Sequence, residues 1–179
     1  PQRPYVTPRA LELDELPAII EQYRQGAVNA QRAGFDGVEI HGANGYLLDQ
    51  FLQDSSNQRS DAYGGSLENR ARLMLEVTDA VTSVWGAGKV GMHLAPRADS
   101  HGMGDSNLSA TFGYVAEQLG LRKLAFLCLR ESVGPDSLGP QMKKLFNGAL
   151  IANENFDGPA AEAILRAGHA DAVAFGKSY

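Results

Sequence analysis

Three residues in the first quarter of the chain, His41, Asn44 and Tyr46, carry groups that could bind and protonate a small polar substrate. His41 and Asn44 can each donate a hydrogen bond to one acceptor oxygen, and the Tyr46 O–H can deliver a proton. Gly42 and Gly45 allow a sharp backbone turn and leave space for a ligand. This spacing predicts a substrate-binding turn. The alternative from the residues alone is a loop with a capping histidine and a packed tyrosine.

The elements that would position these residues are short apolar runs separated by helical patterns. The runs are continuous rather than alternating, which is typical of strands buried on both faces of a parallel sheet. They lie at 37–40, 90–94, 124–129, 149–152 and 172–175. Helical patterns lie at 14–34, 66–84, 110–120, 137–146 and 159–167, with Asp14 and Ser66 as expected N-caps. Such βα repeats predict an α/β fold, either a doubly wound sheet or part of a (β/α)₈ barrel.

The connection after the first predicted strand is unusually long. From 44 to about 66 the sequence has no repeating pattern. Long loops in compact domains are usually functional, and sites in α/β folds lie at the carboxyl ends of the strands. The turn that holds His41, Asn44 and Tyr46 is at such an end, so we expect the site there.

Composition narrows the class of protein. The 179 residues include 16 Lys and Arg against 21 Asp and Glu, a net charge of −5, which argues against nucleic-acid and membrane-surface partners. The single cysteine, Cys128, excludes an intrachain disulfide and a cysteine-based zinc site, and we expect it to be inert core. His101 and His169 lie in polar stretches without ligand-spaced partners, so we expect no metal.

The length suits a single domain over residues 1–179, and the sequence has neither an apolar run of membrane-spanning length nor an apolar signal region. We therefore expect a soluble, cytoplasmic protein. The chain starts without Met in a Pro-rich segment and stops at Tyr179, just after an apolar run. We expect it to be a piece of a longer protein.

The pattern His41-x-x-Asn44-x-Tyr46 after a strand resembles the motif of the Old Yellow Enzyme family of flavin-dependent ene-reductases. The irregular block at 46–72 and the end of the chain at 172–179 are also similar to that family. The resemblance covers nearly the whole chain but only the C-terminal part of the family's TIM (β/α)₈ barrel. It implies about five βα units, which correspond to the family's fourth to eighth strands.

The resemblance also implies a reaction. In this family NADPH reduces a bound FMN, and an alkene activated by a carbonyl or nitro group then lies over the flavin. His41 and Asn44 would hydrogen-bond the substrate oxygen as hydride reaches the β-carbon. Tyr46 would be the catalytic residue that protonates the α-carbon.

The flavin contacts that the resemblance implies include three departures from the family's residues. His93 stands where the family has an arginine near the flavin, and imidazole cannot make the forked contact of guanidinium. Arg97 is a candidate to supply the missing charge. The alternative for His93 is a buried structural histidine. The other two departures concern the phosphate, which the resemblance assigns to Asn153 and Glu154 and to Gly176 and Lys177. Glu154 stands in place of Gly, and Lys177 stands in place of Arg. The alternative there is an ordinary strand-end glycine and a solvated lysine.

Two other functions remain open from the sequence. A partial barrel exposes strand edges and an apolar interior, so the chain could be a catalytically incompetent half-barrel that self-associates or needs its missing N-terminal part. A dinucleotide-binding, doubly wound domain is disfavoured, because no Gly-x-Gly-x-x-Gly pattern follows the first strand.

Overall fold

The computed structural model describes residues 6–97 and 100–176 and contains one parallel sheet. Its five strands pair in chain order, β1-β2-β3-β4-β5, and every pairing is parallel. The strands are β1 (Val38–His41), β2 (Val90–Leu94), β3 (Phe126–Arg130), β4 (Ala149–Asn153) and β5 (Ala172–Ala174). The predicted strands are thus confirmed. The third begins two residues later than expected and extends to Arg130.

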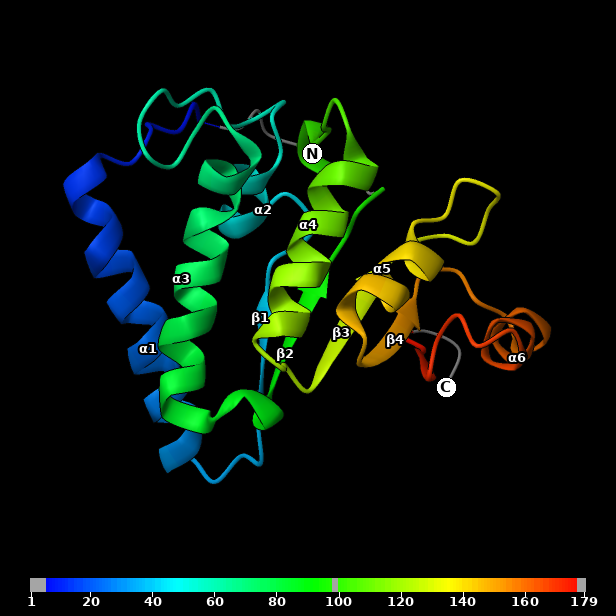
Figure 1. Cartoon of the computed structure of the whole chain (residues 1–179). Helices are drawn as coiled ribbons and strands as arrows, with labels where there is room; N and C mark the ends of the chain where they lie inside the picture. Colours follow the sequence, from blue (N-terminus) through cyan, green and yellow to red (C-terminus); the bar gives the residue numbers. More distant parts are fainter. Residues whose placement is uncertain (1–5, 98–99, 177–179) are drawn as a thin grey trace.

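Helices connect the strands and lie together on one side of them (Figure 1). The α-helices are α1 (Leu16–Arg32), α2 (Leu47–Leu52), α3 (Leu67–Trp85), α4 (Leu108–Leu121), α5 (Gly139–Phe146) and α6 (Gly158–Arg166). Short 3₁₀ turns are η1 (Leu13–Glu15), η2 (Ala87–Lys89) and η3 (Ser100–Gly102). No helix within the described ranges has the length and hydropathy that crossing a bilayer requires.

The two predicted N-caps have different outcomes. The Ser66 hydroxyl accepts a hydrogen bond from the Asn69 backbone N–H at 3.3 Å, so this cap of α3 is confirmed. The prediction for Asp14 is wrong, because Asp14 lies inside η1. The chain begins to turn earlier, where the Glu15 carboxylate accepts the Glu12 N–H at 2.7 Å.

The long connection after β1 contains a short helix that the sequence did not reveal. The six-residue α2 is too short to show a helical repeat, yet Leu48, Phe51 and Leu52 are buried. Asn57 fixes the following turns, because its Nδ2 donates to the carbonyl oxygens of Phe51 at 2.5 Å and of Tyr63 at 2.7 Å. The connection is therefore an ordered platform beside the end of β1.

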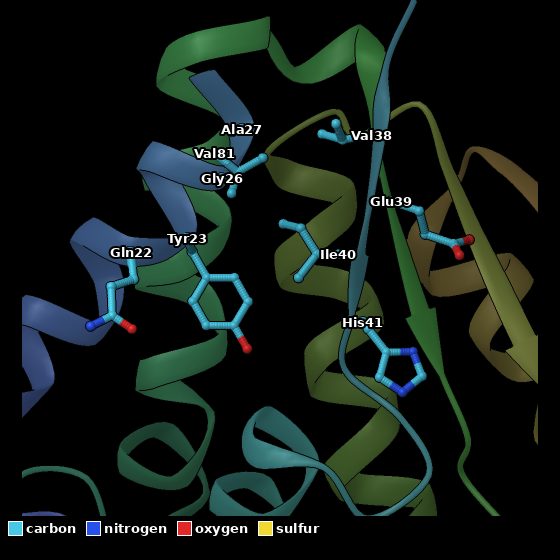
Figure 2. A pocket seen from close by; sticks show the side chains of 9 residues that line it. All are labelled: Gln22, Tyr23, Gly26, Ala27, Val38, Glu39, Ile40, His41 and Val81. Atoms are coloured by element: carbon cyan, nitrogen blue, oxygen red, sulfur yellow. The ribbon is translucent and has the colours of Figure 1, made fainter. Parts of the chain in front are cut away.

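The sheet has one covered face and one open face. Buried strand residues such as Met92, Leu127 and Leu150 face the helices. Figure 2 shows the same alternation in β1, where Ile40 points toward α1 and both Glu39 and His41 point to the opposite side. The expectation of strands buried on both faces holds for most of β2, but it is wrong for the other four strands, whose inner-face residues are half-buried or exposed. One covered wall with an open inner face is the arrangement of a partial barrel.

Two helical glycines provide a matched test of the packing. An added Cβ at Gly120 of α4 would lie 2.3 Å from the Phe146 backbone oxygen, whereas one at Gly26 of α1 would meet nothing within 4 Å. We expect Gly120→Ala to lower the free energy of unfolding by about 1–3 kcal/mol, since the backbone at Phe146 must move. Gly26→Ala should raise it by about 0.5–1 kcal/mol. Chemical denaturation measures both, and equal effects would contradict this account of the α4–α5 contact.

Candidate active site

The register of the parallel strands brings the polar residues together at one edge of the sheet. His41 of β1 lies opposite His93 of β2, and His93 lies opposite Cys128 of β3. The rings of His41 and His93 meet edge to face, with their centroids 5.1 Å apart. Both side chains belong to the open face, at the carboxyl ends of their strands.

The turn after β1 is held in place by hydrogen bonds from α2. Asn44 and Gly45 both have left-handed backbone angles, with φ of 61° and 74°. The buried Asp49 carboxylate accepts the Gly45 N–H at 2.9 Å, and Gln50 Nε2 donates to the Gly45 oxygen at 2.5 Å. Burial raises the pKa of Asp49 above its usual value. The turn therefore has a defined shape that fixes where its side chains point.

The three residues predicted to bind and protonate substrate lie close together. Tyr46 stands at the N-terminus of α2 with 56% of its surface exposed, and its ring centroid is 5.4 Å from that of His41. The Asn44 side chain, from the turn between them, reaches toward β3, where its Oδ1 accepts a hydrogen bond from Arg130 Nη1 at 2.8 Å. Hydrogen-bond donors and a phenol thus face the open end of the sheet from one short turn.

His101 is a neighbour that the sequence analysis set aside. Its Nδ1 lies 2.8 Å from the Asn44 backbone oxygen, and its ring centroid is 5.7 Å from that of Tyr46. Because a carbonyl only accepts, Nδ1 carries the hydrogen in this contact. Gly45 is part of the fit, since an added Cβ there would lie 3.0 Å from the Cβ of His101. No spacing rule could have indicated this contact between two separate loops.

His93 is a partly buried histidine with an unused ring nitrogen. Its Nε2 is buried and has no hydrogen-bond partner among the described residues. The pKa of His93 is lowered to about 4. Burial of the ring is the largest cause, and the positive charges of His41 and Arg130 contribute less. The imidazole is therefore neutral near pH 7, which leaves Nε2 able to meet a polar group of a ligand.

Arg130 at the end of β3 is a second residue that the sequence analysis missed. Its Nε pairs with Glu154 Oε2 at 2.6 Å, in addition to the bond from Nη1 to Asn44. The predicted strand stopped one residue short of Arg130, so its place on the inner face went unrecognised. Arg97, the expected source of the missing charge, instead pairs with Glu131 at 2.7 Å and with Asp136. That expectation is wrong because Arg97 holds the loop after β3.

A cavity of about 840 Å³ opens where β4 and β5 end. Asn153, Glu154 and Gly176 line it, and Asn153 Nδ2 donates to the Ala174 oxygen at 2.8 Å. Glu154 has a left-handed φ of 106°, and its carboxylate is paired with Arg130. The structure thus places three of the four predicted phosphate residues around one cavity. Lys177 lies outside the described residues.

The described residues contain no group of three His, Cys, Asp or Glu side chains arranged to hold a metal ion. Cys128 lies on the inner face beside His93, and burial raises the pKa of its thiol to about 11. The thiol is therefore protonated near pH 7 and is a poor nucleophile and a poor ligand.

Parallel βα units, with helices outside and polar groups at the strand carboxyl ends, define this chain as part of a (β/α)₈ barrel. Residues 2–179 match the model of the NADH:flavin oxidoreductase / NADH oxidase family, and the chain belongs to that family, which includes the Old Yellow Enzyme homologues. The predicted family and fold are confirmed.

Relatives of known name support this membership. A putative 12-oxophytodienoate reductase 4 of Oryza sativa subsp. japonica is 42% identical over 98% of this chain and 48% of its own length. A probable flavin mononucleotide-dependent alkene reductase of Leishmania infantum is 41% identical over 97% of this chain and 48% of its own. The chain thus spans about half the length of these relatives.

Solved structures give the same picture. Morphinone reductase in complex with tetrahydroNAD superposes with a TM-score of 0.93 at 48% identity, covering 97% of this chain and 48% of that one. The old yellow enzyme homologue of Zymomonas mobilis has a TM-score of 0.93 at 40% identity, covering 97% of this chain and 51% of its own. The chain therefore spans about half the length of these solved structures.

The lowered pKa of His93 predicts a pH dependence of stability. The unfolded chain takes up the proton near its ordinary pKa of 6.5, whereas the native chain does so only near 4, so the native state loses stability as the pH falls through this window. At about 1.4 kcal/mol per pKa unit, we expect a loss on the order of 2–3 kcal/mol. Denaturation at pH 7 and pH 4.5 should show this loss in the parent protein and less of it in His93→Gln. An NMR titration that placed the His93 pKa near 6.5 would contradict the prediction.

Proposed function

We propose that the protein containing this chain is an FMN-dependent ene-reductase that uses NADPH to reduce the activated C=C bond of α,β-unsaturated carbonyl or nitro compounds. The observation that carries the proposal is the cluster of His41, Asn44 and Tyr46 at the open end of the sheet. The names of the relatives support it, since one is named as a probable flavin mononucleotide-dependent alkene reductase and another as a putative 12-oxophytodienoate reductase.

The residues at this end of the sheet fit an FMN group. His93 offers a buried ring nitrogen without a partner, on the open face where the ring of a flavin could lie. The cavity beyond Asn153 and Gly176 offers room for the phosphate end. Glu154 does not oppose a phosphate with a free charge, because Arg130 pairs with its carboxylate. FMN would therefore extend from His93 toward the ends of β4 and β5.

The chain's own residues supply binding and proton transfer. When bound, FMN supplies the hydride chemistry. His41 and Asn44 donate hydrogen bonds to the carbonyl or nitro oxygen of the substrate, which draws electrons from the alkene and makes its β-carbon electrophilic. Tyr46, whose ring lies beside His41 with its surface half exposed, donates its phenolic proton to the α-carbon.

Replacing the proposed proton donor should separate the two halves of the reaction. Tyr46→Phe removes the phenolic O–H and keeps the ring, so alkene reduction should fall by about 10²–10⁴-fold, the usual contribution of general acid catalysis. The oxidation of NADPH by bound FMN needs no proton from Tyr46 and should be nearly unchanged. Stopped-flow absorbance of the flavin measures each half-reaction, with NADH run beside NADPH.

Tyr114→Phe is the matched control, because Tyr114 lies on α4, away from the site. It should leave both half-reactions near the parent rates. An equal loss of both half-reactions in Tyr46→Phe would contradict the role of Tyr46. A purified protein that is colourless and does not take up added FMN would contradict the proposed function as a whole.

A second proposal concerns what covers the open face. The sheet ends at β1 and β5, and a cavity of about 470 Å³ lies between α1 and the edge of β1, with Tyr23 and Ile40 on its walls (Figure 2). Unpaired edges and an uncovered inner face favour association. We propose that a further barrel half covers this face, supplied either by more of the same protein or by a second copy.

Sedimentation of the purified 179-residue chain tests this second proposal. We expect the chain to self-associate, because an open sheet edge and a part-apolar inner face gain stability from a partner. A polypeptide with the missing N-terminal half of a relative's barrel should convert the associated form to a one-to-one complex. A chain that remains monomeric and ignores that polypeptide would contradict the proposal.

A further inference from the structure

We propose that Arg130 is a positioning residue that orients the side-chain amide of Asn44 toward the substrate, and that Glu154 holds Arg130 in place. The inference rests on the proposed function, in which Asn44 binds the substrate oxygen. It adds residues to that site which the His-x-x-Asn-x-Tyr pattern does not contain.

The contact between Arg130 and Asn44 decides which way the amide faces. Arg130 Nη1 lies 2.8 Å from Asn44 Oδ1. A guanidinium has only donors, so the atom that faces it must be the amide oxygen, however the amide is first drawn. The NH₂ group of Asn44 then points away from Arg130. It makes no hydrogen bond to another residue in the described ranges, so it is available to a ligand.

The backbone contacts of Asn44 do not fix the orientation of its side-chain amide. Asn44 has a left-handed φ of 61°, and its backbone oxygen is engaged by His101 Nδ1 at 2.8 Å. These features fix the main chain but leave the amide free to rotate about its side-chain torsions. An amide that flips would present its oxygen to the substrate oxygen, which is a repulsive contact. The bond from Arg130 removes that orientation.

Glu154 in turn fixes Arg130. Its Oε2 accepts from Arg130 Nε at 2.6 Å, and its Oε1 accepts from Asn155 Nδ2 at 3.2 Å. The Glu154 backbone is left-handed, with φ of 106°, a conformation that a residue with a side chain rarely adopts. The resemblance would have a glycine here. The ion pair with Arg130 gives a physical reason for a glutamate at a position that otherwise favours glycine.

The three side chains form a bridge across the open end of the sheet. Asn44 follows β1, Arg130 ends β3 and Glu154 follows β4, so the bridge passes over β2 and His93. The charge of Arg130 is also one cause of the low pKa of His93, which places the guanidinium near that ring. A purely structural bridge would stabilise the sheet without affecting how Asn44 meets a ligand, so the test must separate the two roles.

The first measurement is an NMR correlation spectrum of the side-chain amides, with or without FMN. The Asn44 NH₂ signals are identified by their loss in Asn44→Ala. We expect them to shift in Arg130→Met, which keeps the length of the side chain and removes its donors. They should stay in place in Arg122→Met. Arg122 is a matched control, because its side chain is 26% exposed against 32% for Arg130 and it pairs with Asp79, away from the site.

The second measurement is steady-state reduction of 2-cyclohexenone by the FMN-loaded protein. We expect kcat/KM to fall about tenfold in Arg130→Met, as for the loss of one hydrogen bond to a charged group. Arg130→Lys keeps a donor, so its kcat/KM should be about threefold higher than that of Arg130→Met. The kcat/KM of Glu154→Gln should be about threefold lower than that of the parent protein. Arg122→Met should stay within about twofold of the parent.

The outcomes distinguish this inference from the proposed function. A folded Arg130→Met protein with unmoved Asn44 signals, or with unchanged kcat/KM, overturns the positioning role. A parent protein that reduces no alkene overturns the proposed function, while the NMR comparison still decides whether Arg130 orients Asn44. If Arg130→Met does not fold, the same Asn44 signals in Glu154→Gln decide, and signals that do not shift overturn the inference.

Discussion

The pairing of β1, β2 and β3 in one parallel register is the constraint on which the site depends. It sets His41 beside His93 and His93 beside Cys128, while Arg130 is two residues further along β3. Because side chains alternate along a strand, these residues share the open face. A slip of one residue in β2 would turn His93 toward the helices and bring Met92 to the site. The side chains of Met92 and Leu94 are buried in the same core as residues of α3 and α4, and exposing them would make such a slip costly. The helical core therefore fixes the geometry of the polar end.

Charge at this end of the sheet is distributed differently from what the family resemblance implies. An imidazole stands on β2 where a guanidinium was expected, and a guanidinium stands at the end of β3. Both cannot be charged at low cost, because they share a partly dehydrated region in which like charges repel. Burial of the ring is the main cause of the lowered pKa of His93, and the charges of His41 and Arg130 add to it, while Glu154 forms an ion pair with Arg130. The presence of a glutamate at position 154 is therefore explained by its ion pair with Arg130.

The sequence was informative where interactions are local and periodic. Continuous apolar runs predicted the five strands of the described residues, and Ser66 identified the start of α3. The sequence was not informative for α2, whose six residues are too few to show a helical repeat. The prediction of a cap at Asp14 was also wrong, because a capping box between Glu12 and Glu15 begins the turn two residues earlier. The turn from His41 to Tyr46 was predictable because its residues are neighbours in sequence. The roles of those residues remain predictions.

The contacts of His101 and Arg130 could not have been predicted in the same way. Each joins loops that are far apart in the chain, and each depends on where a long or flexible side chain points after the strands have paired. Arg130 also lies one residue beyond the predicted end of its strand, so the pattern gave no indication that it shares a face with Cys128. Arg97 is the opposite case. It is close to His93 in sequence, which suggested that it would supply charge near the flavin, but its side chain pairs with Glu131 in the loop after β3.

The open face links the proposed chemistry to the proposed partner. In the proposed reaction, hydrogen bonds from His41 and Asn44 would stabilise a developing charge most strongly in a site from which water is excluded, because the local dielectric constant is then low. Tyr46 is half exposed in the described chain, and Glu39 and His41 are exposed on the same face. A ligand held against one wall alone would leave these donors in competition with water. Coverage of the inner face would therefore act on the proposed reaction itself, and a protein that binds FMN without that coverage should reduce alkenes weakly even though the three side chains proposed to face the substrate are in place.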